Sequence, residues 1–159
     1  MSLKGKHTKI KLNLVKTTLN NELLTGDTIL LYGDISSKII KHTYNLIKPN
    51  GQIFVIGRNI DLIRFNKFTR GKYKKNVIVN PYFETIPENT LNHILIANMS
   101  LNLNKVVHLA KQAHSKLKLN GQLIVIDNNI SKQELIALNK NIPWFRLKLN
   151  SEALIFEKV

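Results

Sequence analysis

The chain alternates between short apolar runs and stretches in which apolar residues recur every three or four positions. The first clear run, residues 28–33, follows a Gly26-Asp27 turn and ends at Gly33. After Ser36, apolar residues fall on one helical face, at Ile39, Ile40, Tyr44 and Ile47. A buried strand, a tight turn and a helix form the repeating unit of a parallel α/β sheet. The pattern therefore predicts that residues 28–47 open such a sheet.

The same unit recurs along the chain. Apolar runs predict further strands at residues 52–56, 76–80, 92–97 and 122–127, and helical spacing predicts helices at 60–68 and 103–118. Two near copies each end a helix and lead into a strand that begins with Gln: Lys48-Pro49-Asn50-Gly51 and Lys118-Leu119-Asn120-Gly121. This similarity indicates two equivalent crossovers in one sheet.

The last third of the chain predicts a helix and a hairpin. Ser131 and Glu134 have the spacing of a capping box, so a helix should begin there and end before Pro143. Residues 144–149 and 152–156 are extended runs that lie too close in sequence to be parallel. The predicted fold class is therefore α/β: a three-layer α/β/α sandwich with a seven-stranded, mostly parallel sheet and a C-terminal antiparallel β-hairpin. Six strands should be parallel and one reversed.

Residues 1–159 read as a single domain. Residues 1–16 form a basic N-terminal arm in which Ile10, Leu12 and Leu14 alternate with polar residues, as in an edge strand or a docked arm. Residues 17–25 follow as a short, helical lead-in to the first turn.

Composition adds a strong positive charge and excludes several chemistries. The formal net charge is +14 and the sequence pI is about 10.1. The absence of cysteine excludes disulfides and thiolate metal sites, and the histidines lack metal-ligand spacing, so no metal is expected. His93, at the start of an apolar strand, reads as a hydrogen-bonded core or rim histidine. No membrane span or signal peptide is visible, which favours a cytoplasmic protein.

The charge points to a polyanionic partner such as RNA, although a Lys- and Asn-rich composition alone would also produce it. The densest cluster is the segment 67–75, in which cations surround one aromatic residue. Such a mixture can bind phosphates and stack a base, whereas the alternative is a solvated loop. The candidate nucleic-acid-binding residues are Lys67, Arg70, Lys72, Tyr73, Lys74 and Lys75.

Five crossover strands followed by an antiparallel hairpin resemble the class I S-adenosylmethionine-dependent methyltransferases. The resemblance covers residues 26–158 and implies that family's Rossmann-like fold and its cofactor, S-adenosylmethionine. The family's first strand ends in an acidic residue and a loop with three alternating glycines. Gly33 matches the first glycine, whereas the acidic position is Leu31 and the other two glycine positions are Ile35 and Ser37.

The resemblance implies a cofactor site at the carboxyl ends of the strands, made of Gly33, Asp34, Ser36, Arg58, Asn80 and Asn98. Several of these residues also have simpler interpretations. Ser36 suits a helix N-cap, and Arg58 suits a phosphate or carboxylate better than a ribose diol. Asn80 can accept a hydrogen bond from adenine or simply end a strand, and Asn98 fits a turn.

Three functional hypotheses follow. The first is a methyltransferase acting on RNA or another anionic substrate, in which catalysis is mainly positioning because no general base is evident. The second is a catalytically inactive module of the same fold that binds nucleic acid or a protein. The third is a Rossmann-like protein that uses another nucleotide, with Arg58 on a phosphate. A homodimer or a partner subunit is expected because the chain has no inserted substrate-recognition domain.

The turn after Gly33 discriminates between the first two hypotheses. A methyltransferase needs the cofactor volume to be open, whereas a side chain of Tyr32 or Ile35 that fills it favours the inactive module.

Overall fold

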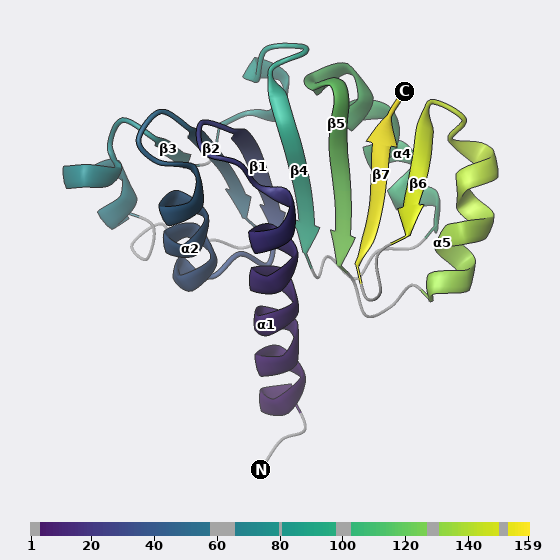
Figure 1. The fold of residues 1–159 in the computed structure, drawn as a ribbon, viewed down its shortest axis with the longest axis horizontal. Coiled ribbons are helices and arrows are strands. Elements are labelled where there is room, and N and C mark those ends of the chain that lie inside the picture. The colour runs from purple at the N-terminus through teal and green to yellow at the C-terminus, as the bar shows by residue number, and fades with distance from the viewer. Residues whose placement is uncertain (1–3, 58–65, 80, 98–102, 127–130, 150–152) are drawn as a thin grey trace.

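The computed structural model describes residues 4–57, 66–79, 81–97, 103–126, 131–149 and 153–159. These residues form one seven-stranded sheet with helices on both faces (Figure 1). The strand order is β3-β2-β1-β4-β5-β7-β6. The helices are α1 (Lys4–Glu22), α2 (Ser37–Ile47), α4 (Leu103–Lys116) and α5 (Lys132–Leu138). The strands are β1 (Thr28–Gly33), β2 (Gln52–Gly57), β3 (Val77–Val79), β4 (Leu91–Ala97), β5 (Leu117–Ile126), β6 (Phe145–Leu149) and β7 (Leu154–Lys158).

The predicted fold class is confirmed. Strands β1 to β5 pair in parallel, whereas β7 is antiparallel to both β5 and β6. Strand β6 therefore runs in the same direction as the first five strands, and only β7 is reversed. The architecture is that of a class I methyltransferase-like fold.

Strand β1 is buried on both faces because its successive side chains enter two different cores. Ile29 and Leu31 face α1 and α2, whereas Leu30 faces α4. All three are fully buried. This explains why β1 appears in the sequence as a continuous apolar run, since a strand with one solvated face would alternate.

Helix α1 corrects one prediction. Residues 1–16 were expected to form an edge strand or a docked arm, but from Lys4 onward the chain is helical. The edge strand is wrong because the alternation at residues 10–14 does not continue. Instead, Leu12, Val15, Leu19 and Leu23 follow helical spacing and pack on the α2 face of the sheet. The first turns of α1 extend past the carboxyl ends of the strands (Figure 1).

The predicted helix at 60–68 lies largely outside the described residues. Its last part belongs to a 3₁₀ turn, η1 (Lys67–Thr69), which is followed by a second, η2 (Gly71–Tyr73). A third 3₁₀ turn, η3 (Phe83–Thr85), links β3 to β4, and η4 (Asn139–Asn141) follows α5.

A chain of polar side chains closes the amino edge of the sheet. His93 Nε2 lies 2.8 Å from Asp27 Oδ2, and its Nδ1 lies 3.0 Å from Gln122 Oε1. Gln122 Nε2 donates to Glu22 Oε2 at 3.0 Å. This confirms the prediction that His93 is a hydrogen-bonded histidine, because it is only 7% exposed and both ring nitrogens have partners. The chain ties β1, β4, β5 and the end of α1 together.

The capping box that predicts α5 is also present. Glu134 N donates to Ser131 Oγ at 3.1 Å, and Ser131 N donates to Glu134 Oε2 at 2.9 Å. Within the described residues, no helix is both long enough and apolar enough to cross a membrane.

Helix α1 should contribute strongly to stability through its apolar stripe. We expect Leu19→Ala to lower the free energy of unfolding by about 2–5 kcal/mol, because Leu19 is completely buried. The control is Leu24→Ala, at a side chain that is 71% exposed. Urea denaturation measures both, and equal stabilities for the two variants would contradict the packing of α1.

Two histidines should make stability depend on pH. Burial and the nearby Lys16 ammonium lower the pKa of His42 below 6.5, and burial and Lys158 lower that of His114. Below pH 6.5 the unfolded chain therefore binds more protons than the folded one, so stability should fall as the pH decreases from 6.5. Denaturation at pH 5.5 and 7.5 tests this, and the double variant His42→Gln/His114→Gln should show a smaller difference. An equally steep loss in that variant would contradict the assignment.

Candidate functional site

The carboxyl edge of the sheet has a row of very small residues at its centre. In the strand register, Gly33 of β1 lies opposite Gly57 of β2 on one side and Ala97 of β4 on the other. The strand order reverses between β1 and β4, since β1 leads outward to β2 while β4 leads to β5. In open α/β sheets, ligands bind beyond the carboxyl ends of the strands at this reversal. The row therefore lies where the fold is most suited to a ligand.

The backbone at Gly33 turns sharply out of the sheet. Its φ is +112°, which glycine adopts far more readily than any residue with a side chain. Asp34 N donates to Ala97 O at 2.9 Å, and Ile35 N donates to Gly33 O at 3.0 Å. The turn is therefore fixed against β4 by backbone hydrogen bonds, and no Cβ covers it at Gly33.

The two side chains that could have filled the space above Gly33 belong to the cores. Ile35 is 6% exposed and lies in the α2-side core with Ile39. Tyr32 is half-buried and packs on the opposite, α4 side. A β-branched residue at this turn is thus explained by core packing. The turn is buried at Gly33 and Ile35 and exposed at Asp34.

Ser36 has a structural role in this turn. It is the N-cap of α2, with extended backbone angles, and its Oγ accepts a hydrogen bond from Ile39 N at 3.3 Å. Asp34, by contrast, is exposed at the same turn. Of the predicted cofactor residues, the structure brings Gly33, Asp34 and Ser36 together on one short segment.

The other three predicted cofactor residues, Arg58, Asn80 and Asn98, lie outside the described residues. In the sequence they directly follow the last residues of β2, β3 and β4. Their roles remain predictions.

A cavity that the sequence did not predict lies on the α4 face of the sheet. It measures about 160 Å³ and is bounded by β1, β4, α4 and η3. Lys116, 8% exposed, holds η3 beside α4 by donating to Ile86 O at 2.8 Å. The lining of the cavity is Leu30, Tyr32, Phe83, Glu84, Ile94, Ile96, Leu109, Gln112 and Ala113.

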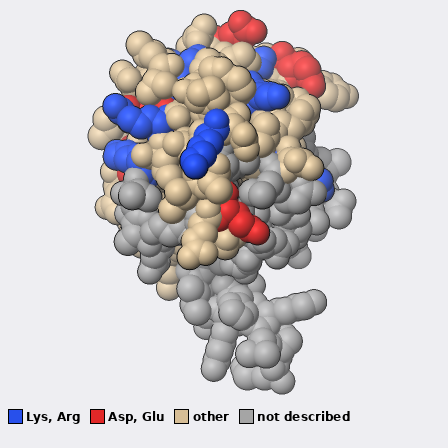
Figure 2. Space-filling model, turned by 90° about the vertical axis from the view of Figure 1, so that its right-hand side faces the viewer, with Lys and Arg blue, Asp and Glu red and all other residues tan. Residues whose placement is uncertain are grey.

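Charge is distributed unevenly between the two ends of the sheet. At the β6 and α5 end, acidic and basic side chains are mixed (Figure 2). There Arg146 pairs with Glu157 at 2.6 Å, and Lys148 lies 3.6 Å from Glu22. At the other end, the described segment 66–79 contains five Lys or Arg residues and no acidic residue.

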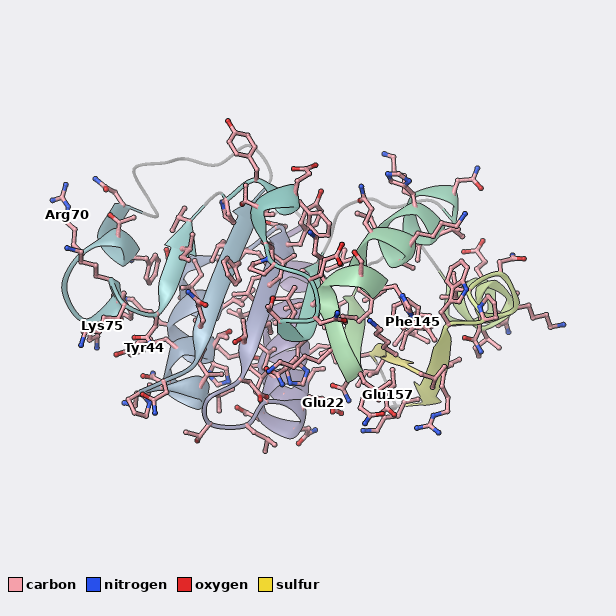
Figure 3. The ribbon with its side chains drawn as sticks, turned by 90° about the horizontal axis from the view of Figure 1, so that it is seen from above. Glu22, Tyr44, Arg70, Lys75, Phe145 and Glu157 are labelled. Atoms are coloured by element: carbon pink, nitrogen blue, oxygen red, sulfur yellow. The ribbon has the colours of Figure 1, made fainter. Side chains whose placement is uncertain are left out.

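The predicted nucleic-acid-binding residues all lie at this basic end, on η1, η2 and the turn that precedes β3. Figure 3 shows Arg70 and Lys75 there, far from Phe145 at the opposite end. Lys75 is close to the amino end of β3, whereas Gly33 is at the carboxyl end of β1. The structure thus groups these residues with one another and not with the cofactor residues. Among the described residues, no group of His, Cys, Asp or Glu side chains is placed to hold a metal ion.

Comparisons with known proteins agree on the fold. No protein-family profile matches the sequence, and no curated protein matches it. Among solved structures, a SAM-dependent methyltransferase from Aquifex aeolicus is similar, with a TM-score of 0.74 and 18% identity over 91% of this chain and 89% of that one.

Two further structures are similar. One is a Burkholderia thailandensis 1,6-didemethyltoxoflavin-N1-methyltransferase with bound S-adenosylhomocysteine, with a TM-score of 0.74 and 10% identity over 94% of this chain and 78% of that one. The other, from Clostridium thermocellum, is named as a candidate rRNA-methylase, with a TM-score of 0.62 and 14% identity over 94% and 96% of the two chains. At these identities, the similarity establishes the fold.

The cap at Ser36 yields a simple prediction. We expect Ser36→Ala to lower the free energy of unfolding by about 1 kcal/mol, because Ile39 N loses its side-chain acceptor. Ser36→Asp should retain most of the stability, since Asp also caps helices. Thermal or urea denaturation measures both. If Ser36→Ala is as stable as the unmodified protein, the cap does not stabilise α2.

Proposed function

We propose that this protein is a cytoplasmic S-adenosylmethionine-dependent methyltransferase that acts on RNA or another anionic substrate. The observation that carries the proposal is the row formed by Gly57, Gly33 and Ala97 at the carboxyl edge. It combines the smallest side chains with the reversal of strand order, where ligands of this class of sheet bind.

The residues of the turn suit a ligand that lies against the backbone. At Gly33 the positive φ and the missing Cβ allow close approach. The exposed Asp34 supplies a carboxylate next to it. We expect Arg58, Asn80 and Asn98 to complete the site from the neighbouring strands. A carboxylate for the ribose is missing directly after β2, where the sequence reads Gly57-Arg58, so Asp34 is our candidate for that role.

The cofactor would supply a methyl group on a cationic sulfur, which a nucleophilic acceptor can attack directly. The protein's contribution would then be to hold donor and acceptor in line and to exclude water, which can account for a large part of a rate enhancement. This agrees with a site that offers few acid–base groups among the described residues.

The substrate class is inferred from charge. A net charge of +14 favours association with polyanions, and RNA is the polyanion most compatible with a similar structure named as a candidate rRNA-methylase. Charge attracts any nucleic acid without selecting a sequence, so it does not identify the atom of the substrate that accepts the methyl group.

The cofactor proposal is tested by calorimetric titration with S-adenosylmethionine and S-adenosylhomocysteine. Two positive-φ glycines flank β1, Gly33 at +112° and Gly26 at +88°. Replacing either with Ala should introduce backbone strain of about 1–2 kcal/mol, but only Gly33 is at the candidate site. We expect Gly33→Ala to weaken cofactor binding by about tenfold, or about 1.4 kcal/mol, and Gly26→Ala to leave it within about twofold.

Arg58→Glu and Asn80→Ala should weaken binding as well. If the folded, unmodified protein binds neither ligand, the methyltransferase proposal fails and the inactive module of the same fold is favoured. Equal losses in the Gly33 and Gly26 variants would show that strain, and not the site, controls binding.

A further inference from the structure

We infer that the β3 end of the sheet carries a separate surface that binds the phosphate backbone of double-helical nucleic acid. The inference does not depend on the proposed methyl transfer. We call this the β3-end surface and define it by seven residues: Lys41, Lys48, Lys67, Arg70, Lys72, Lys74 and Lys75.

All seven side chains are exposed, and within the part of the chain that the structure describes none is paired with a carboxylate. Lys41 and Lys48 join the surface from α2. They lie three residues before and four residues after Tyr44, so they share its helical face. Tyr44 in turn contacts η2, since its hydroxyl donates to Lys72 O at 3.4 Å. The two parts of the surface are therefore adjacent.

The segment that carries most of these cations is firmly anchored. Phe68 is fully buried in the core on the α2 side of the sheet. Asn76, which is 6% exposed, donates from Nδ2 to Pro49 O at 2.8 Å and to Gly51 O at 2.7 Å. Cations on an ordered segment lose less backbone entropy on binding than cations on a disordered tail. The anchoring thus makes this a preformed surface.

The aromatic rings in the segment are used for internal packing. The Tyr73 ring makes edge contacts with Tyr44 and Phe68, with centroids 4.8 and 5.0 Å apart. The Lys72 ammonium lies 5.1 Å from the Tyr73 centroid. The sequence predicts that the Tyr73 ring stacks a base, but in the structure the ring packs against these neighbours. The surface therefore presents cations for phosphates, whereas the Tyr73 ring is packed against its neighbours.

This chemistry selects a class of partner. Proteins that bind single strands combine cations with stacking aromatics, whereas lysine contacts to the phosphates of a duplex need no base contact. At the β6 end, by contrast, two of the cations, Arg146 and Lys148, have acidic neighbours. Seven exposed cations without a carboxylate partner, around a tyrosine ring that is packed internally, fit the backbone of a duplex.

The surface is also close enough to the carboxyl edge for one partner to reach both. Val77 is level with Ile29 through the register of β3, β2 and β1, and Gly33 is four residues further along β1. With two strand spacings and four residue rises, the separation of Val77 and Gly33 is about 16 Å. A nucleic acid held at the β3 end can therefore extend to the turn at Gly33.

The test is fluorescence anisotropy with a 20-base-pair RNA duplex, the DNA duplex of the same sequence and one RNA strand alone, at about 50 and 200 mM salt. We expect both duplexes to bind more tightly than the single strand, with affinity falling steeply as salt increases. Lys74→Glu/Lys75→Glu should weaken duplex binding by about tenfold or more. The control, Lys111→Glu/Lys140→Glu, makes the same change in net charge at exposed lysines elsewhere and should cost less than about threefold.

A second variant, Tyr73→Leu, tests whether the Tyr73 ring stacks on an unpaired base. It should leave binding of the single strand and of the duplexes within about twofold, whereas a stacking role would require a larger loss for the single strand. The inference is overturned if no duplex binds, if both lysine pairs lose affinity equally, or if the single strand is preferred and Tyr73→Leu abolishes that preference. Calorimetry of Lys74→Glu/Lys75→Glu with S-adenosylmethionine keeps the two proposals separate, because cofactor binding should be unchanged.

Discussion

The burial of β1 on both faces is the constraint on which the rest of this structure depends. Three successive side chains, Ile29, Leu30 and Leu31, are fully buried in two different cores. A strand with no solvated face must be covered by helices on both sides. Helices α1 and α2 cover one face, and α4 covers the other. The three-layer arrangement, and the central place of β1 between β2 and β4, follow from that requirement.

The two edges of the sheet are then used differently. The amino edge is closed by the polar chain Asp27–His93–Gln122–Glu22 and by Lys158, which donates to Leu117 O at 2.9 Å. The carboxyl edge at β2, β1 and β4 ends in Gly57, Gly33 and Ala97, which bring no polar side chain to it. The hydrogen-bonded polar side chains of this chain thus lie at the amino edge, whereas the three central strands end in glycine or alanine at the carboxyl edge.

Charge is concentrated in a third region, at the β3 end of the sheet. The cations of the segment 67–75 surround an aromatic cluster in which Tyr73 packs between Tyr44 and the buried Phe68. This explains why an aromatic residue lies among lysines without being free to stack a base. It also separates the proposed binding of a polyanion from the proposed site of chemistry, so that each can be altered without the other.

The sequence by itself determined the sheet, most of its strands, the hairpin and the caps at Ser36 and Ser131, because these depend on local periodicity and on short hydrogen bonds. The prediction for residues 1–16 was wrong. A brief alternation at residues 10–14 suggested a strand, whereas α1 has a helical apolar stripe that is buried only through contacts with the sheet. The role of Ile35, the partners of His93 and the packing of Tyr73 were decided only by the tertiary structure. Each of these depends on residues distant in sequence, which no local pattern encodes: the α2-side core for Ile35, Asp27 and Gln122 for His93, and Tyr44 for Tyr73.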